Sequence, residues 1–441
     1  MMSADSDTIF AVASGAGRAA IAVLRLSGPA TPRVLKSLTG RLPAARLATL
    51  IKLQNPADGI PIDKGVVIYS PAPKSFTGED YAEFHVHGGR AILAAMIEAL
   101  SRFDGTRPAE PGEFTRRALL NGKLDLAQAE GLGDLIAAET EAQRRQAMRQ
   151  TEGVLGAKAA QWRQALTEAT ALLSAEIDFP EEEDVAREGR GRMAGRVGVL
   201  CSELKAELVA GSTAERLREG LTIVIAGPPN AGKSTLLNTL ARREVAIVSP
   251  FAGTTRDALE VHLDLDGYPV TLIDTAGLRE TEEAVERIGV SRAREKAEAA
   301  DLVLWLSEAT HPLPPAIASS EIWPILTKSD LLGEDRAPEC GTLAISAATG
   351  RHIDRLIERL AGFARQTLKD GHAGLIVRAR HRRACESALQ SLERILADPE
   401  SPAELLAEDL RAARTALESL TGAIDVEEIL GEIFSRFCIG K

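Results

Sequence analysis

The chain has few cysteines and no segment suited to crossing a membrane. Its 441 residues include only Cys201, Cys340, Cys385 and Cys438, which are scattered and form no C-x-x-C pair. This spacing argues against a disulfide framework and against a zinc site, and it favours a reducing, cytoplasmic setting. No run of 18 apolar residues occurs, and the first ten residues lack a basic stretch followed by an apolar core. We therefore expect neither a membrane span nor an export signal.

Positive charge is also in short supply. The formal net charge is −11, so the whole surface is not suited to binding nucleic acid nonspecifically, and any RNA contact must use a local basic patch. Hydrophobic residues make up 45% of the chain, which excludes a disordered protein or a fibre. At this length we expect two to four domains.

The residue pattern changes three times along the chain and predicts a multidomain protein. Short strand-like runs around one helix predict an α+β domain, Ala/Glu/Arg/Leu stretches predict an all-α domain, and alternating strands and helices predict an inserted α/β domain. The predicted segments are 1–122 (α+β), 123–216 (helical, first part), 217–374 (α/β) and 375–441 (helical, second part). The acidic string at 178–184 is read as a solvated loop between helices.

A phosphate-binding loop lies at the start of the α/β domain. Residues 227–234 read GPPNAGKS and fit G-x-x-x-x-G-K-[ST]. The loop follows the apolar run 221–227 and opens a helix at 233–243, so its backbone N–H groups can surround phosphate oxygens. In this setting Lys233 can reach the β and γ phosphates, and Ser234 can hold Mg²⁺.

A second nucleotide motif follows forty residues later. Residues 274–277 read DTAG after an apolar strand, so Asp274 is placed to hold Mg²⁺ through water and Gly277 to sense the γ-phosphate. Between the two motifs, AGTTRD at 252–257 fits a switch loop. Either of its threonines could supply a Mg²⁺ ligand, and Thr255 is preferred by analogy with other GTPases.

The string TKSD at 327–330 predicts the choice of base. The carboxylate of Asp330 can accept both N–H groups of the guanine Watson–Crick edge, which adenine does not offer. Thr327 replaces the more usual asparagine, as in Rho-type GTPases, while Lys328 keeps its packing stem. The predicted GTP contacts are Asn230, Ala231, Gly232, Lys233, Ser234, Thr235, Ser249, Thr254, Thr255, Asp274, Thr275, Ala276, Gly277, Thr327, Lys328, Asp330, Ser346 and Ala347.

The glutamine that orients the attacking water in Ras-like proteins is missing. Leu278 stands directly after DTAG, so hydrolysis must be slow or must use another group. Glu286, in VERIG, is a candidate, although the residues alone favour an ordinary solvated helix glutamate.

Strings along the whole chain resemble the MnmE (TrmE) family of tRNA modification GTPases. They include LRLSG, SFTGEDYAE, PGEFTRRA and NGKLDLAQAE near the start, the G-domain strings above, and CIGK at 438–441. The resemblance implies an N-terminal domain that dimerises and binds a one-carbon tetrahydrofolate, such as the 5,10-methylene or 5-formyl derivative. Arg25, Glu83, Lys123 and Lys441 are the residues it assigns to folate, since cations suit the glutamate tail and a carboxylate suits pterin N–H groups.

The resemblance also implies activation by potassium. Asn230 would give a side-chain ligand, and the loop from Ser249 to Thr254, including Phe251, would surround the ion. A cation beside the phosphates can replace an arginine finger. The family pattern then assigns the orientation of water to Glu286, with Lys233 as the second catalytic residue.

The reaction and partners come from the same resemblance. The family works as a homodimer with an FAD-dependent partner, MnmG (GidA), in a heterotetrameric or larger complex. It adds an aminomethyl or carboxymethylaminomethyl group to C5 of the wobble uridine (U34) of certain tRNAs, using a methylenetetrahydrofolate carbon.

Some alternatives stay open. Cys438 could attack uridine or merely position the tail. His85 and His87 lie two residues apart and could bind a metal, but without an obvious third ligand a structural role is favoured. Two rival functions are a ribosome-assembly type RNA-binding GTPase and a structural scaffold with a relic GTPase. The first predicts a basic extension, and the intact nucleotide motifs argue against the second.

Overall fold

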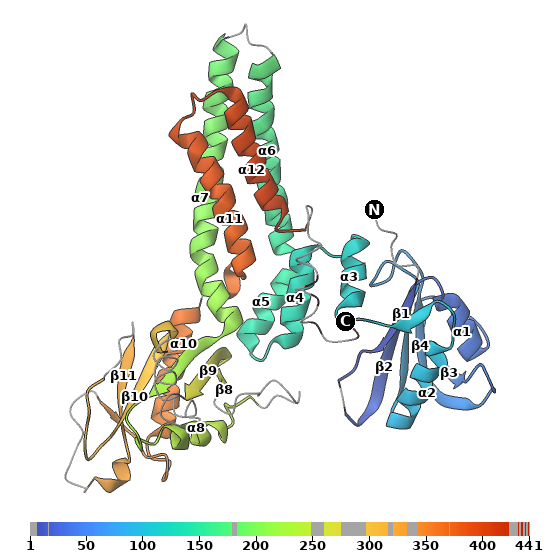
Figure 1. Ribbon diagram of the computed structural model, residues 1–441, viewed down its shortest axis with the longest axis horizontal. Helices are drawn as coiled ribbons and strands as arrows, with labels where there is room; N and C mark the ends of the chain where they lie inside the picture. Colours follow the sequence, from blue (N-terminus) through green and yellow to red (C-terminus); the bar gives the residue numbers. More distant parts are fainter. Residues whose placement is uncertain are drawn as a thin grey trace, which may run out of the picture. The chain divides into compact units, whose positions relative to one another are not determined.

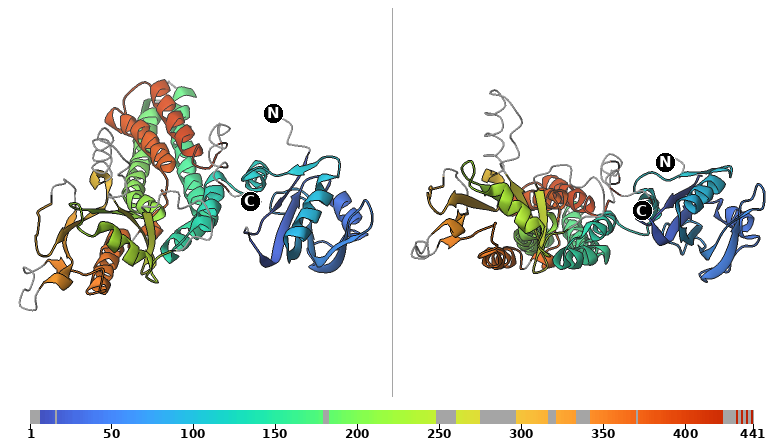
Figure 2. Two further views of the ribbon diagram at one scale, coloured as in Figure 1. Left: turned by 60° about the horizontal axis from the view of Figure 1, so that its bottom comes forward. Right: turned by 90° about the horizontal axis from the view of Figure 1, so that it is seen from below.

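The computed structural model describes most of the chain in two compact units. The described residues are 7–15, 17–178, 183–247, 260–274, 297–315, 321–332, 342–369 and 371–422, together with residues 431, 434, 437 and 440. The first unit comprises Met1–Gly133, Thr151–Arg163 and Thr415–Lys441, and the second comprises Asp134–Gln150 and Gln164–Arg414. Both are drawn in Figures 1 and 2.

A six-stranded sheet forms the centre of the first unit. Its strands, in the spatial order β3-β4-β5-β2-β1-β6, are β1 (Thr8–Val12), β2 (Ala19–Ser27), β3 (Thr49–Gln54), β4 (Pro61–Ser70), β5 (Tyr81–Gly88) and β6 (Thr106–Pro108). Residues alternate between the two faces, as a strand requires. In β5, for example, Ala82, Phe84 and Val86 are buried, while Glu83 and His85 lie on the opposite face.

Two helices cover one face of this sheet. Helices α1 (Thr31–Thr39) and α2 (Arg90–Ser101) share a hydrophobic core with the strands, in which Leu35 and Met96 pack near Leu24. The other face carries Arg25 of β2 and also a second buried apolar cluster that includes Ile9 and Tyr81. A third helix, α3 (Glu113–Leu120), follows the short strand β6.

The tail of the chain packs within the first unit. Phe434 is buried with Leu126 and Ala129 at the start of α4 (Leu126–Ala137), and it lies 2.8 Å from where a Cβ would stand on Gly112. These contacts bring Phe434 beside the residue that precedes α3.

The second unit joins a set of long helices to a second sheet. The helices are α5 (Glu141–Thr151), α6 (Val154–Asp178), α7 (Glu183–Glu219), α11 (Ala379–Ala397) and α12 (Ala403–Glu418), of which α5 and α6 have parts in both units and the end of α12 belongs to the first. Helices α7 and α11 run side by side (Figure 1). None of the helices in the described residues is long and apolar enough to cross a membrane.

Three glutamine side chains of α5 donate hydrogen bonds to backbone carbonyls near the two connections between the long helices and the second sheet. The bonds run from Gln143 Nε2 to Arg218 O (3.1 Å), from Gln146 Nε2 to Ala214 O (2.8 Å) and Gly371 O (3.1 Å), and from Gln150 Nε2 to Leu375 O (3.0 Å). The spacing of three and four residues places all three side chains on one face of the helix.

The second sheet is the α/β domain expected from the sequence. Its order is β12-β11-β10-β7-β9-β8, and every pairing is parallel except that of β8 with β9. Its strands are β7 (Leu221–Ala226), β8 (Glu260–Leu265), β9 (Tyr268–Asp274), β10 (Leu302–Glu308), β11 (Ile322–Thr327) and β12 (Leu343–Ala344), and α8 (Lys233–Ala241) and α10 (Ile353–Leu368) pack on one face. The predicted fold class, an α+β domain, a helical domain and an inserted P-loop α/β domain, is confirmed. The domain boundaries stay predictions. Helix α7 continues to Glu219, past the boundary drawn at 216.

Candidate functional site

The phosphate-binding loop turns tightly against a neighbouring strand. Gly227 follows β7, and a Cβ at this position would lie 2.2 Å from Leu306 O of β10. Its φ of +148°, like that of +89° at Gly232 just before α8, favours glycine. The two glycines therefore let the chain leave the buried strand, turn over the sheet edge and begin α8.

Two side chains of the loop lie as the motif predicts. Lys233 is the first residue of α8, and its Nζ donates to Gly227 O and Pro228 O, both at 2.9 Å. These two bonds hold the ammonium across the loop. Lys233 is only 9% exposed. Asn230 is exposed and has a φ of +63°, which sets it at the outer bend of the loop.

Ser234 and Asp274 come together beside the loop. Asp274 ends β9, the parallel neighbour of β7, and it is almost fully buried. Ser234 Oγ donates to Asp274 Oδ2 at 2.7 Å. A hydroxyl and a carboxylate at the carboxyl edge of a parallel sheet are the oxygen donors that suit Mg²⁺.

Thr327 links three segments at this edge. It ends β11, and its Oγ1 lies 2.7 Å from Ala231 O of the phosphate-binding loop and 3.1 Å from Ser307 O of β10. The side chain is buried, so the single hydroxyl proton serves carbonyls that water does not reach. The threonine hydroxyl thus joins the end of β11 to the phosphate-binding loop and to β10.

The remaining residues predicted to recognise the base also lie at this edge. Lys328 has a φ of +55° and pairs through Nζ with Glu308 Oε1 at the end of β10. Asp330 follows in a short 3₁₀ turn (Ser329–Leu331) and is exposed. Ser346 is buried, and Thr239 of α8 donates to Ala347 O at 3.4 Å.

Several predicted site residues lie outside the described residues. They are Ser249, Phe251, Thr254, Thr255, Thr275, Ala276, Gly277, Glu286, Cys438 and Lys441.

A second polar cluster occupies the open face of the first sheet. Arg25 and Glu83 are direct cross-strand partners on β2 and β5, and Arg25 Nε donates to Glu83 Oε1 at 3.3 Å. Glu83 also accepts from Tyr81 Oη at 2.9 Å and lies 3.3 Å from His85 Nε2. Burial, together with the nearby Glu83 carboxylate, raises the pKa of Tyr81, even though Arg25 opposes the shift. The tyrosine is therefore a donor to Glu83 at neutral pH.

Lys123 and the tail approach the same region. Lys123 Cε lies 3.2 Å from where a Cβ would stand on Gly78, in the loop that precedes β5. Arg25 Nη1 donates to Gly440 O at 3.2 Å, so the residue before Lys441 contacts the cluster.

The two histidines of β5 have separate partners. His85 faces Glu83, whereas His87 Nδ1 lies 2.8 Å from Asp63 Oδ1. Among the residues that the structure describes, no group of three or more His, Cys, Asp or Glu side chains could hold a metal ion. Burial acts to raise the pKa of Asp63, but hydrogen bonds from His87 and Lys64 outweigh it and hold that pKa low. His87 therefore has the Asp63 carboxylate as its own hydrogen-bond partner.

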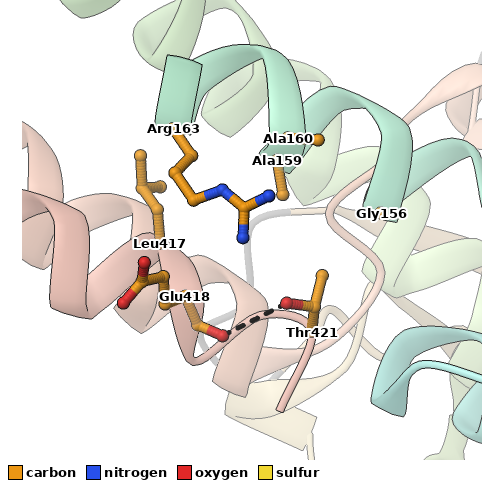
Figure 3. Close-up of a pocket in the computed structure, with 7 residues that line it drawn as sticks. All are labelled: Gly156, Ala159, Ala160, Arg163, Leu417, Glu418 and Thr421. Atoms are coloured by element: carbon orange, nitrogen blue, oxygen red, sulfur yellow. Dashed lines mark hydrogen bonds between the residues drawn. The ribbon is translucent and has the colours of Figure 1, made fainter. Parts of the chain in front are cut away.

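A small hollow lies between α6 and the end of α12 (Figure 3). Arg163 points into it from α6, opposite Glu418 and Thr421. Its volume of about 90 Å³ is well below the roughly 300 Å³ at which ligand pockets usually begin. None of the predicted site residues lines this hollow, and we assign no ligand to it.

Two contacts at these sites are absent from the sequence predictions. Glu308, which pairs with Lys328, could have been found as a polar residue ending an apolar strand at the carboxyl edge. Phe76 lies with its ring centroid 5.9 Å from Arg25 Cζ, and no periodicity of the sequence marks it.

The fold and the site define a P-loop GTPase. A glycine-rich loop, a serine–aspartate pair and a TKxD string meet at one edge of a parallel sheet, where nucleotides bind in open α/β folds.

Comparison with known proteins makes the assignment specific. The family model "GTP-binding protein TrmE N-terminus" matches residues 8–123, and "MnmE helical domain" matches residues 126–438. A tRNA modification GTPase MnmE of Beijerinckia indica is 58% identical over 436 residues, which cover 99% of this chain and 96% of that protein. One from Rhodopseudomonas palustris is 53% identical over 443 residues and the full length of both. The chain belongs to the MnmE family of tRNA modification GTPases.

Solved structures resemble only part of this chain in the matches compared. A variant of Aquifex aeolicus Era bound to GDP·AlF4⁻ is 26% identical, covering 33% of this chain and 56% of that one, with a TM-score of 0.25. That score is too low to add to the assignment.

Replacing Thr327 by valine tests the link between the base-recognition string and the phosphate-binding loop. Valine keeps the shape but leaves the carbonyl of Ala231 without its partner, which costs about 1–3 kcal/mol in a buried site. We expect affinity for GDP to fall about tenfold, measured by the fluorescence of a labelled nucleotide. Thr327→Ser keeps the hydroxyl and is the matched control. Equal affinity in the valine and serine variants would show that the bond has no part in binding.

Proposed function

We propose that this chain is a potassium-activated GTPase that takes part in tRNA modification. With the FAD-dependent partner MnmG (GidA), it adds an aminomethyl or carboxymethylaminomethyl group to C5 of the wobble uridine (U34) of certain tRNAs. The carbon comes from methylenetetrahydrofolate. The observation that carries the proposal is the family match along the whole chain, at 58% identity over 99% of its residues. The same match favours this role over ribosome assembly.

The geometry supports GTP as the nucleotide. Lys233, the first residue of α8, would bind phosphate oxygens together with backbone N–H groups of the loop before it. Ser234 and Asp274 fit Mg²⁺ as a donor pair, and Mg²⁺ supplies charge neutralisation on the phosphates. Asp330, exposed at the carboxyl edge, accepts the guanine N–H donors while the stem of Lys328 packs on the base.

Of the proposed potassium ligands, Asn230 lies within the described residues. Asn230 offers an amide oxygen at the outer bend of the loop, where a cation would lie beside the phosphates. Potassium would supply the positive charge that an arginine finger supplies in other GTPases. Glu286 is the residue we assign to orienting the attacking water.

The open face of the first sheet fits a reduced folate. Arg25 presents a guanidinium for a carboxylate, and Glu83 presents a carboxylate for pterin N–H groups, on adjacent strands. Lys123 and Lys441 complete the proposed site. We further propose that the protein acts as a cytoplasmic homodimer, since the family resemblance assigns dimerisation to this domain.

Potassium dependence is tested by GTP turnover in potassium against sodium at equal ionic strength. We expect turnover to be at least about tenfold faster in potassium, because the ion stabilises charge that develops on the phosphates. Asn230→Ala should lose most of this stimulation. Equal rates of the unaltered protein in the two salts would overturn the metal-activated mechanism and leave GTP binding intact.

The role in tRNA modification is tested by mass spectrometry of wobble uridines. Total tRNA from a strain lacking the gene should lose the C5 substituent, and the gene on a plasmid should restore it. Unchanged C5 modification in the deletion strain would refute the assignment.

A further inference from the structure

The loop at residues 75–80, between β4 and β5, contacts two of the residues proposed to bind folate. The ring of Phe76 lies against the guanidinium of Arg25, with 5.9 Å between Arg25 Cζ and the ring centroid. Gly78 has a φ of +82°, and a Cβ there would meet Lys123 Cε at 3.2 Å. Any shift of this loop therefore moves the surroundings of both cations.

The loop is tied to β2 by side-chain hydrogen bonds. Ser27 Oγ lies 2.7 Å from both Thr77 Oγ1 and Glu79 Oε2. Ser27 follows Arg25 by two residues, so both side chains lie on the same face of the strand. Asn121 Nδ2 donates to Thr77 O at 2.7 Å from the other side.

Glu79 is also the outer end of a buried ion network. Arg117 of α3 donates through Nη1 to Glu79 Oε1 at 3.2 Å and through Nη2 to Glu113 Oε1 at 3.0 Å. Glu113 has a fully buried side chain and accepts two further bonds from Arg107, at 2.7 and 2.9 Å. Burial acts to raise the pKa of Glu113, but the bonds from Arg107, the Glu110 backbone and Arg117 outweigh it, so this pKa is lowered. Glu113 is therefore charged at neutral pH.

Buried ion networks are a poor means of gaining stability. The cost of removing charges from water often equals or exceeds the attraction between them, and apolar residues of similar volume serve as well or better. A guanidinium nevertheless has a planar set of donors that fixes the direction of its partners. In this domain, Arg117 fixes the loop through Glu79, and its partner Glu113 ties α3 to Arg107 of β6.

We propose that Glu79 and Arg117 are positioning residues for the folate site. Their ion pair holds the 75–80 loop so that Phe76 packs on Arg25 and Gly78 packs on Lys123, in the arrangement that binds a reduced folate. The inference rests on the proposed folate function. Neither residue contacts the ligand.

Glu79→Gln in the full-length chain tests the proposal. Glutamine keeps the size of the side chain and a bond to Ser27 but loses the charge that faces Arg117. We expect the Kd for 5-formyltetrahydrofolate, measured by isothermal titration calorimetry, to rise about tenfold. GTP turnover should be unchanged. Glu98→Gln, which breaks the exposed pair with Arg102 on α2, is the matched control and should bind folate normally.

Two further variants separate positioning from stability. Glu79→Asp keeps the carboxylate and should recover most of the affinity, whereas a purely structural role predicts that the shorter side chain is no better than glutamine. Ser27→Ala removes the second hold on Glu79 and should also weaken folate binding, which keeps the proposal testable if Glu79→Gln does not fold. Folate affinity within twofold of the unaltered protein in both Glu79→Gln and Ser27→Ala would overturn the inference alone. Failure of the unaltered protein to bind 5-formyltetrahydrofolate would overturn the folate function and the inference together.

Discussion

The close approach of Gly227 to β10 is the constraint on which the nucleotide site depends. No side chain fits between this residue and Leu306 O, so the loop can leave β7 only with a glycine at that point. Since β7 lies between β9 and β10, the loop emerges at the centre of the carboxyl edge. Asp274 at the end of β9 and Thr327 at the end of β11 then reach it from either side.

The two proposed sites have the same kind of construction. In each, a buried polar side chain from a neighbouring element fixes a loop that lies at the site. Thr327 does this for the phosphate-binding loop through the carbonyl of Ala231, and Arg117 does it for the 75–80 loop through Glu79. A buried polar group without its partner is costly, so both loops have one strongly preferred position.

Much of this could be predicted from the sequence because the signals are local. The apolar run before GPPNAGKS and the leucine spacing after it predict strand, loop and helix, and the structure has β7 and α8 at these places. The cross-strand pairing of Arg25 with Glu83 could not be predicted from spacing, because register depends on how distant strands align. Glu308 is marked in the sequence as a polar residue at the end of an apolar strand, but its pairing with Lys328, twenty residues away, depends on β10 and β11 being parallel neighbours. The ion network of Arg117 is hard to predict for a further reason. The charged residues in PGEFTRRA have the pattern of an exposed helix face, but in the structure Glu113 and Arg117 of α3 are buried and paired.

We propose that GTP bound at the carboxyl edge of the second sheet drives the modification of tRNA. Asp330→Asn tests it most directly, because an amide has a single acceptor oxygen for the two guanine N–H donors, while its NH2 group can donate to the additional oxygen of xanthine. We expect this variant, with the flavin partner and unmodified tRNA, to modify the wobble uridine when given XTP and to be inactive with GTP. Normal modification by the variant with GTP, or modification without any nucleotide, would contradict the account.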